Sequence, residues 1–413
     1  MTSITSPHID STQSGKISKT AAYYYAFIIL GLITGVFGPT INNLARHTQS
    51  TLNEISIIFA VRSFGYLVGS LISGRLYDRV RGHPLIIGAL IATALAFVLI
   101  PLIPLLWLMT LVSFLLGLAE SSIDVGGNSL LPWVHGDKVG PFMNGLHFFF
   151  GVGAFLSPMV VAQVVLSTGE IVWAYWLLAL AALPAAAWLT RLPSPSPMLL
   201  QTERRLAHEA RNPHPTSDVY AASSRASRND SLLVAATVAF FFLYVSAEIT
   251  YGNWIFTYAT RLNLGDATTA ALLTSAFWGA FTVGRLIGVP LSTRLRPATI
   301  LLIDLLGATA SVIGVMVFAQ SVVALWIGTI ATGAFMASIF PTMLTLAARK
   351  MNITGEITGW FLVGGGAGAM FTPWLIGQLI EPIGAQITMA LVLASLVVAL
   401  VALGIIVTSS KNK

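Results

Sequence analysis

The chain has no cysteine and little charge, since charged residues make up only 9% of its 413 positions. Without cysteine it can form neither disulfides nor thiolate metal sites. Hydrophobic residues make up 55% of the chain and its mean hydropathy is +0.81. That is more apolar material than a soluble core of this size uses, so we expect the bilayer to be the solvent.

The chain also lacks the patterns of catalytic and cofactor sites. It shows no nucleotide-binding loop, no metal-ligand spacing and no nucleophile with a paired base on a polar segment. The first twenty residues lack the short apolar core and cleavage site of a signal peptide. We therefore predict neither an enzyme nor a resident cofactor, and we expect the first membrane helix itself to direct insertion.

Apolar segments long enough to cross a membrane recur along the chain. Roughly 20 apolar residues span about 30 Å of hydrocarbon, and windowing finds about twelve such segments. This pattern predicts an all-α membrane protein with helices over residues 22–44, 52–76, 84–103, 105–131, 142–166, 170–191, 232–258, 267–290, 298–318, 321–347, 356–379 and 382–408.

The only long polar segment inside the chain divides these helices six from six. Residues 192–230 are rich in proline, serine and arginine. We therefore predict an N-terminal tail over 1–21, a six-helix half over 22–191, a linker over 192–230, a second half over 231–408 and a tail over 409–413.

The two halves repeat one another. Arg79 and Arg294, like Pro158 and Pro373, are 215 positions apart, and Gly117 and Gly333 are 216 apart. Such an offset indicates two like-oriented halves related by pseudo-symmetry. In transporters built this way, the site lies near the bilayer midplane between the halves.

Basic residues predict the orientation. If the N-terminus is cytoplasmic, Arg46 and Arg261 are the only Lys or Arg residues on the outer side. Both termini are then cytoplasmic, and the formal charge of +6 reflects topology rather than nucleic-acid binding. The compact loops suggest a bacterial inner membrane, and we expect a monomer.

Three polar residues interrupt the fourth predicted helix. Glu120, Asp124 and Asn128 are four positions apart and share one helical face. A charged side chain at this depth costs about 3 kcal/mol and usually marks an ion or substrate path. The carboxylates can carry a proton, or Asp124 and Asn128 can hold Na⁺. The alternative is a structural ion pair between Glu120 and Arg62.

Polar residues of the fifth helix lie at a similar predicted depth. Asn144 and His147 begin this helix, so a hydrogen-bonded cluster with Asp124 and Asn128 is one expectation. His147 is then a proton relay, because imidazole titrates near neutral pH. The alternative is that it simply locks two helices together.

The seventh and eighth helices carry groups suited to a sugar. Glu248, Tyr251, Asn253, Trp254 and Trp278 combine a carboxylate, an amide and aromatic faces, which match hydroxyl edges and apolar ring faces. For Tyr251 and Trp254, the alternative is an interfacial aromatic belt.

Other polar residues have simpler expected roles. Asn43 gates the outer entrance or caps the end of the first helix. Arg285 and Asp304 are intramembrane charges on adjacent helices and are expected to neutralise each other without a transport role.

The loop between the second and third helices carries a recognisable motif. Residues 74–84 read Gly-Arg-Leu-Tyr-Asp-Arg-Val-Arg-Gly-His-Pro, which resembles the signature loop of the major facilitator superfamily, with one extra residue before the glycine. The resemblance implies a gate in which Gly74 permits close helix approach while Asp78 and Arg79 form a latch favouring the outward-facing state.

A narrower resemblance covers four helices. The runs over residues 38–40, 123–128, 140–158 and 242–254 look like those of sodium-dependent glucose transporters, with fucose:proton symporters as broader relatives. This resemblance implies hexose movement coupled to H⁺ or Na⁺. Arg62 departs from it, because neutral amides are expected there; a cation can pair with a carboxylate or favour an anionic substrate.

The sequence therefore predicts a sugar symporter working by alternating access, with lipid and a small polar solute as partners. The runner-up is proton-driven efflux of amphipathic compounds, which the Ser157-Pro158 sequence disfavours because drug antiporters have a Gly-Pro pair there. A membrane sugar receptor that moves nothing is the competing class. For the symporter, Glu120→Gln is expected to abolish accumulation against a gradient.

Overall fold

The computed structural model describes residues 8–195, 228–351 and 355–408. Most of the predicted linker and both extreme tails lie outside these ranges. Every regular element within them is a helix, which confirms the predicted all-α class. Eleven of the helical segments are long and apolar enough to cross a membrane.

The N-terminal half contains the first six membrane crossings. Its helices are α1 (His8–His47), the short α2 (Leu52–Ile55) continuing into α3 (Ile57–Tyr77), α4 (Gly82–Leu99), α5 (Leu106–His135), α6 (Gly140–Thr168) and α7 (Ile171–Thr190). Two short 3₁₀ segments, η1 (Ile100–Leu102) and η2 (Gly136–Lys138), follow α4 and α5.

The C-terminal half supplies the other six crossings. Its helices are α9 (Arg228–Arg261), α10 (Ala267–Arg294), α11 (Pro297–Val317), α12 (Val322–Met336) with α13 (Ile339–Lys350), α14 (Gly355–Ile383) and α15 (Ile387–Thr408). The tenth predicted span is thus one crossing built from two helices, broken at Ala337 and Ser338. The eleventh crossing, α14, has 29 residues and is the one that the count by length and composition leaves out.

The turn between the last two crossings lies later in the chain than expected. The eleventh helix was expected to end at 379 and the twelfth to begin at 382, but α14 continues to Ile383 and α15 begins at Ile387. The chain turns at Gly384, whose φ is 106°, a conformation that glycine adopts without a Cβ clash. Pro382 lies inside the last turn of α14 and does not end the helix.

The two halves share an internal packing contact. A Cβ on Gly117 would lie 2.0 Å from the carbonyl oxygen of Arg62, and one on Gly333 would lie 2.4 Å from that of Phe277. Arg62 and Phe277 are themselves 215 positions apart. The repeat read from the sequence therefore corresponds to equivalent glycine-to-backbone contacts in each half.

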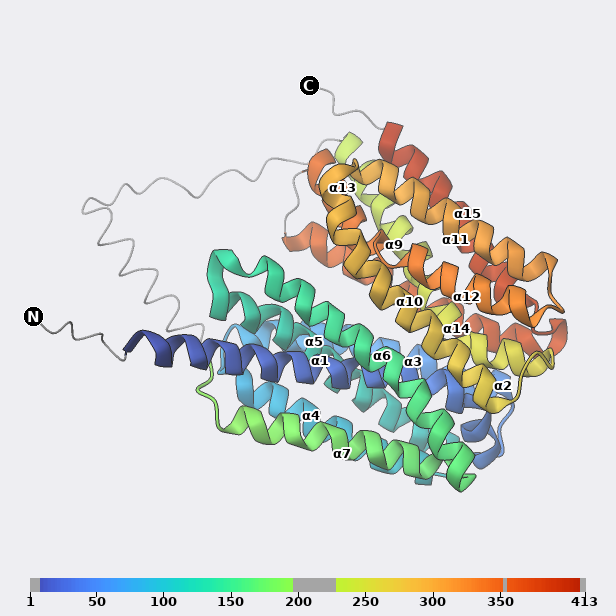
Figure 1. Cartoon of the computed structure of the whole chain (residues 1–413), viewed down its shortest axis with the longest axis horizontal. Coiled ribbons are helices and arrows are strands. Elements are labelled where there is room, and N and C mark those ends of the chain that lie inside the picture. The colour runs from blue at the N-terminus through green and yellow to red at the C-terminus, as the bar shows by residue number, and fades with distance from the viewer. Residues whose placement is uncertain (1–7, 196–227, 352–354, 409–413) are drawn as a thin grey trace, which may run out of the picture.

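The halves meet along two pairs of helices, α3 with α14 and α6 with α10, and α1 also packs against α9. We call the end of the bundle that carries α2 the α2 end, and the opposite end, where the chain enters α1 and leaves α15, the terminal end. In Figure 1 the ribbons of the halves lie together at the α2 end and diverge toward the terminal end.

Hydrogen bonds between the halves follow the same distribution. Within the described residues they join α2 and α3 to α14. Gln378 Nε2 donates to the Asn53 carbonyl at 3.0 Å, and the Leu52 N–H donates to Glu381 at 3.0 Å. Ser63 Oγ reaches the Ala369 carbonyl at 3.4 Å. These hydrogen bonds hold the two halves together at the α2 end, so this end is closed in this conformation.

Candidate functional site

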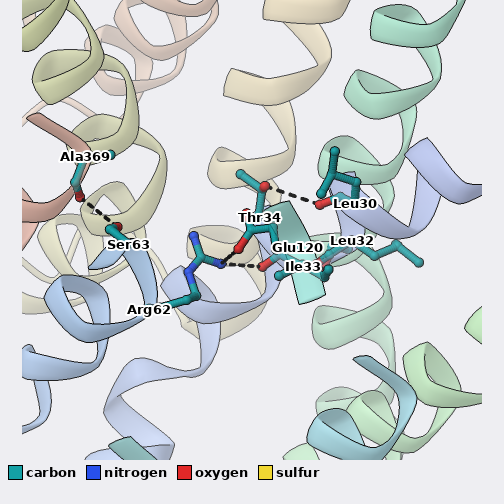
Figure 2. A network of polar contacts seen from close by, with 9 residues as sticks. Leu30, Leu32, Ile33, Thr34, Arg62, Ser63, Glu120 and Ala369 are labelled. Atoms are coloured by element: carbon teal, nitrogen blue, oxygen red, sulfur yellow. Dashed lines mark hydrogen bonds and ion pairs between the residues drawn. The ribbon is translucent and has the colours of Figure 1, made fainter. Parts of the chain in front are cut away.

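Arg62 in α3 and Glu120 in α5 form an ion pair inside the N-terminal half. Their Nη1 and Oε2 atoms are 3.7 Å apart, and the side chains are 9% and 10% exposed. The same Nη1 donates to the Ile33 carbonyl at 3.2 Å, and the guanidinium lies 5.1 Å from the ring centroid of Phe37. Figure 2 shows the Arg62 guanidinium reaching both Glu120 and the Ile33 carbonyl of α1. The two charges thus neutralise each other, as the alternative for Glu120 anticipated.

Asp124, one turn further along α5, has different partners. The Tyr66 hydroxyl donates to its Oδ2, and Asn128 Nδ2 donates to its Oδ1 at 2.8 Å. Asn128 Nδ2 also donates to the Asp124 backbone carbonyl at 3.0 Å. Among the described side chains, no cation lies within ion-pair distance of Asp124. Its carboxyl group is therefore held by neutral donors alone.

Glycines bring α3 and α5 close enough for these contacts. A Cβ on Gly65 would lie 2.3 Å from the Phe114 carbonyl oxygen, and one on Gly69 would lie 2.1 Å from the Ser121 hydroxyl. Small residues let helix backbones approach closely in a membrane. Because Arg62 and Tyr66 are one turn apart on α3, they face Glu120 and Asp124 in register.

The expected cluster around His147 does not form. The His147 ring packs edge-on against Phe27, with centroids 6.1 Å apart, and Asn144 is exposed. Neither side chain has a described hydrogen bond to Asp124 or Asn128, which bond to each other and to Tyr66 instead. His147 does interact electrostatically with Arg285 of the opposite half.

In the C-terminal half, Glu248 lies buried near mid-α9. It interacts electrostatically with Tyr244 and with Arg285. The Tyr244 hydroxyl donates to the Met336 carbonyl at 2.9 Å, next to the break between α12 and α13. Trp278 is 1% exposed, and its indole Nε1 has no hydrogen-bond partner in the described structure. A buried N–H without a partner is costly, so such groups warrant a functional explanation.

The other predicted sugar contacts of α9 hold the fold together. The Tyr251 hydroxyl lies 3.0 Å from Thr329 Oγ1, and its ring stacks on Phe277. Trp254 Nε1 donates to the Pro373 carbonyl at 3.0 Å. Both residues are fully buried, so the alternative of an interfacial belt is wrong. Asn253 is also buried. Its backbone carbonyl oxygen would lie 2.9 Å from a Cβ on Gly38 of α1.

The expected pairing of Arg285 with Asp304 is wrong. Asp304 accepts a hydrogen bond from Ser338 Oγ, at the break before α13. The Arg285 guanidinium lies 4.5 Å from the Phe281 ring centroid, and its buried Nε has no partner. Arg62 with Glu120 is the one ion pair in the described part of the chain. The sequence alone could not show which of these two pairs forms, because in each pair the acidic residue lies on a helix that neighbours the helix of the arginine.

The signature loop is open in this conformation. A Cβ on Gly74 would have no atom within 4 Å, so the expected close helix approach is absent here. Asp78 is the C-cap residue of α3, and it and Arg79 are exposed. Neither forms an ion pair with another described residue.

Asn43 lines a hollow of about 440 Å³ at the α2 end, between the ends of α1, α9 and α14. It does not cap α1, because that helix continues to His47. The expected capping role is therefore wrong, and the gating role stays a prediction.

The sequence did not predict three features of these buried polar groups. They are Tyr66 beside Asp124, Tyr244 beside Glu248, and the position of Arg285. Tyr66 could have been found, because it stands four residues after Arg62 and so faces the residue four after Glu120. Tyr244 likewise precedes Glu248 by one turn.

Comparison with known proteins shows a family match over most of the chain. A family model for the Major Facilitator Superfamily matches residues 23–373. The mouse sodium-dependent glucose transporter 1A is 30% identical over 389 residues, covering 86% of this chain and 88% of that protein. The sodium-dependent glucose transporter 1 of Xenopus laevis is 31% identical over 354 residues, covering 83% and 72%.

Solved structures share the fold at low sequence identity. A crystal structure of a D-xylose-proton symporter aligns with a TM-score of 0.73 at 12% identity, covering 93% of this chain and 97% of that one. The nucleoside transporter NupG aligns with a TM-score of 0.71, also at 12% identity, covering 96% and 100%. The matched family and the twelve membrane crossings agree, and we conclude that this multi-pass membrane protein is a transporter of the Major Facilitator Superfamily.

Proposed function

We propose that the protein is a cation-coupled sugar symporter in which Asp124 carries the coupling charge. The observation behind this proposal is the difference between two buried carboxylates one turn apart. Glu120 is already neutralised by Arg62, whereas Asp124 has only neutral donors. A buried charge without a counter-ion is costly, so a transported H⁺ or Na⁺ that neutralises Asp124 stabilises the loaded carrier.

Arg62 and Glu120 are positioning residues in this mechanism. Their pair ties α3, α5 and the backbone of α1 together, so it fixes the face on which Asp124 lies. Asn128 and Tyr66 orient the Asp124 carboxylate. His147 packs on Phe27 rather than bonding to Asp124 or Asn128, so it is not part of the coupling group.

The sugar binds between this group and the C-terminal half. Glu248, the unpartnered Trp278 N–H and the Arg285 guanidinium provide polar contacts there, and Phe150 and Phe281 lie against the Trp278 ring. Polar groups beside aromatic faces suit a pyranose. The mouse and Xenopus relatives named as sodium-dependent glucose transporters and the xylose symporter fold support this substrate class.

The terminal end faces the cytoplasm in this proposal, because short cytoplasmic loops carry the excess of Lys and Arg. The α2 end is then external, and its fastened contacts correspond to a state open toward the cytoplasm. Alternating access rocks one half against the other, breaking the α3–α14 contacts as the other end closes.

Uptake of labelled glucose into proteoliposomes tests the proposal. We expect glucose to accumulate under only one of the two inward gradients, Na⁺ or H⁺. When neither gradient is present, we expect no accumulation. Glucose counterflow without any cation gradient serves as the control for binding and exchange. Neither uptake nor counterflow of glucose, fucose or xylose would overturn the sugar assignment and advance efflux of amphipathic compounds.

A further inference from the structure

The hollow at the α2 end contains the two basic residues that the sequence places outside the cytoplasm. Arg46 lies in the last turn of α1 and Arg261 ends α9, and both line the same space of about 440 Å³. They are 215 positions apart, the same offset as the internal repeat. Each half therefore contributes the equivalent arginine to one shared hollow.

These guanidinium groups have no carboxylate partner in the described structure. The only ion pair there is the buried one between Arg62 and Glu120. Two like charges facing one space from opposite halves repel one another, and this repulsion opposes closure of the α2 end.

Glu381 itself lines the hollow, and it and the acidic residues of the neighbouring segments accept hydrogen bonds from backbone N–H groups. Glu381 accepts from the Leu52 N–H at 3.0 Å, Glu54 accepts from the Thr51 N–H at 2.8 Å, and Asp266 accepts from the Thr269 N–H at 2.8 Å. That backbone hydrogen bond lowers the pKa of Asp266. Because each carboxylate satisfies a backbone donor near a helix start, the arginines remain available to another anion.

Part of the remaining lining is polar, and Ala45, Leu52, Phe256 and Ala267 supply its apolar part. Asn42 and Asn43 supply amide N–H donors, and Ser50 and Thr260 supply hydroxyls. Arginine binds oxyanions through charge-assisted hydrogen bonds from its planar fork. A single bound anion would contact both halves at once.

We propose that this hollow is a binding site for a small inorganic anion, held between Arg46 and Arg261, and that the bound anion stabilises the state with the α2 end closed. The site lies at the outer entrance, apart from the buried groups Asp124 and Glu248. Its occupancy opposes opening toward the outside, and so acts on the transport cycle without touching the transported solute.

Thermal unfolding of the purified full chain in lipid-free detergent is the first test, with sodium sulfate added at constant ionic strength. A ligand that binds only the folded state raises the melting temperature in a saturable way. We expect a saturating rise for the unaltered protein, an affinity about tenfold weaker in Arg46→Gln or Arg261→Gln, and no saturating rise in the double variant.

Sulfate also stabilises proteins nonspecifically, so a matched variant is required. Arg349→Gln removes an exposed arginine at the terminal end and should keep the full saturable rise. An equal rise in all variants would overturn the proposal. A rise caused only by phosphatidylglycerol in mixed micelles would overturn it too, because the ligand would then be a lipid headgroup.

The effect on conformation has its own readout. Because the chain has no cysteine, Ser56→Cys provides a single thiol at a buried position against Gly377 of α14. Sulfate should slow maleimide labelling of this thiol, and the double arginine variant should abolish that slowing. Sulfate binding with unchanged labelling would overturn the conformational half of the proposal.

Discussion

The two halves are built alike, yet they treat buried charge in opposite ways. In the N-terminal half, Arg62 touches Glu120 and Asp124 is held by two neutral donors. In the C-terminal half, Arg285, Glu248 and Asp304 make no ion pair among the described residues, although Arg285 and Glu248 interact at longer range. The difference teaches that the repeat preserves backbone packing while the polar side chains diverge. Under the proposed function, one half holds the coupling carboxylate and the other holds the groups that bind the solute.

The largest expected effect distinguishes the proposed coupling carboxylate, Asp124, from the carboxylate proposed to bind the solute, Glu248. Asp124→Asn should reduce the glucose ratio across the membrane to its equilibrium value while counterflow continues, because an amide cannot exchange the coupling charge. Glu248→Gln should weaken glucose affinity roughly tenfold or more, the value of a charge-assisted hydrogen bond, while accumulation still follows the gradient. Uptake and counterflow in proteoliposomes measure both, and accumulation by the Asp124 variant would contradict the division between halves.

The second prediction breaks the ion pair. Arg62→Gln leaves Glu120 buried without its partner and should destabilise the protein by about 3–5 kcal/mol. The double variant with Glu120→Gln should recover much of that loss, since no charge is then stranded. Thermal unfolding in detergent provides the comparison; equal loss in the single and double variants would mean that the pair adds no electrostatic stability. The matched change Arg285→Gln should cost less, because its guanidinium has no ion-pair partner to strand.

A third prediction compares equivalent glycines. Gly117→Ala and Gly333→Ala each place a Cβ near 2.0 or 2.4 Å from a backbone oxygen, so both should push two helices apart at a cost of about 1–3 kcal/mol. Only Gly117→Ala should also impair coupling, because its helix pair carries Arg62 and Asp124. Thermal unfolding measures the loss of stability, and the ratio of uptake to counterflow measures the loss of coupling. Impaired coupling in the Gly333 variant alone would contradict the assignment of the coupling group to the N-terminal half.

The smallest effect concerns one N–H group. Trp278→Phe keeps an aromatic ring but removes an indole donor that has no protein partner. Stability should change little, whereas glucose affinity should fall about fivefold, equivalent to one neutral hydrogen bond of about 1 kcal/mol. Trp254→Phe is the control, since its donor is bonded to Pro373 and its loss should lower stability instead. A lowered melting temperature with unchanged affinity in the Trp278 variant would remove it from the solute site.

Sequence alone determined the all-α class, the two halves and the buried carboxylates of α5, because hydrophobic length and helical period act locally along the chain. The Glu120, Asp124 and Asn128 spacing already fixed their common face. Only the tertiary structure decided which charges meet: Arg62 reaches Glu120 because glycines draw α3 against α5, whereas Arg285 and Asp304 remain apart. Distances between helices depend on packing across the whole bundle, and helical periodicity carries no information about them.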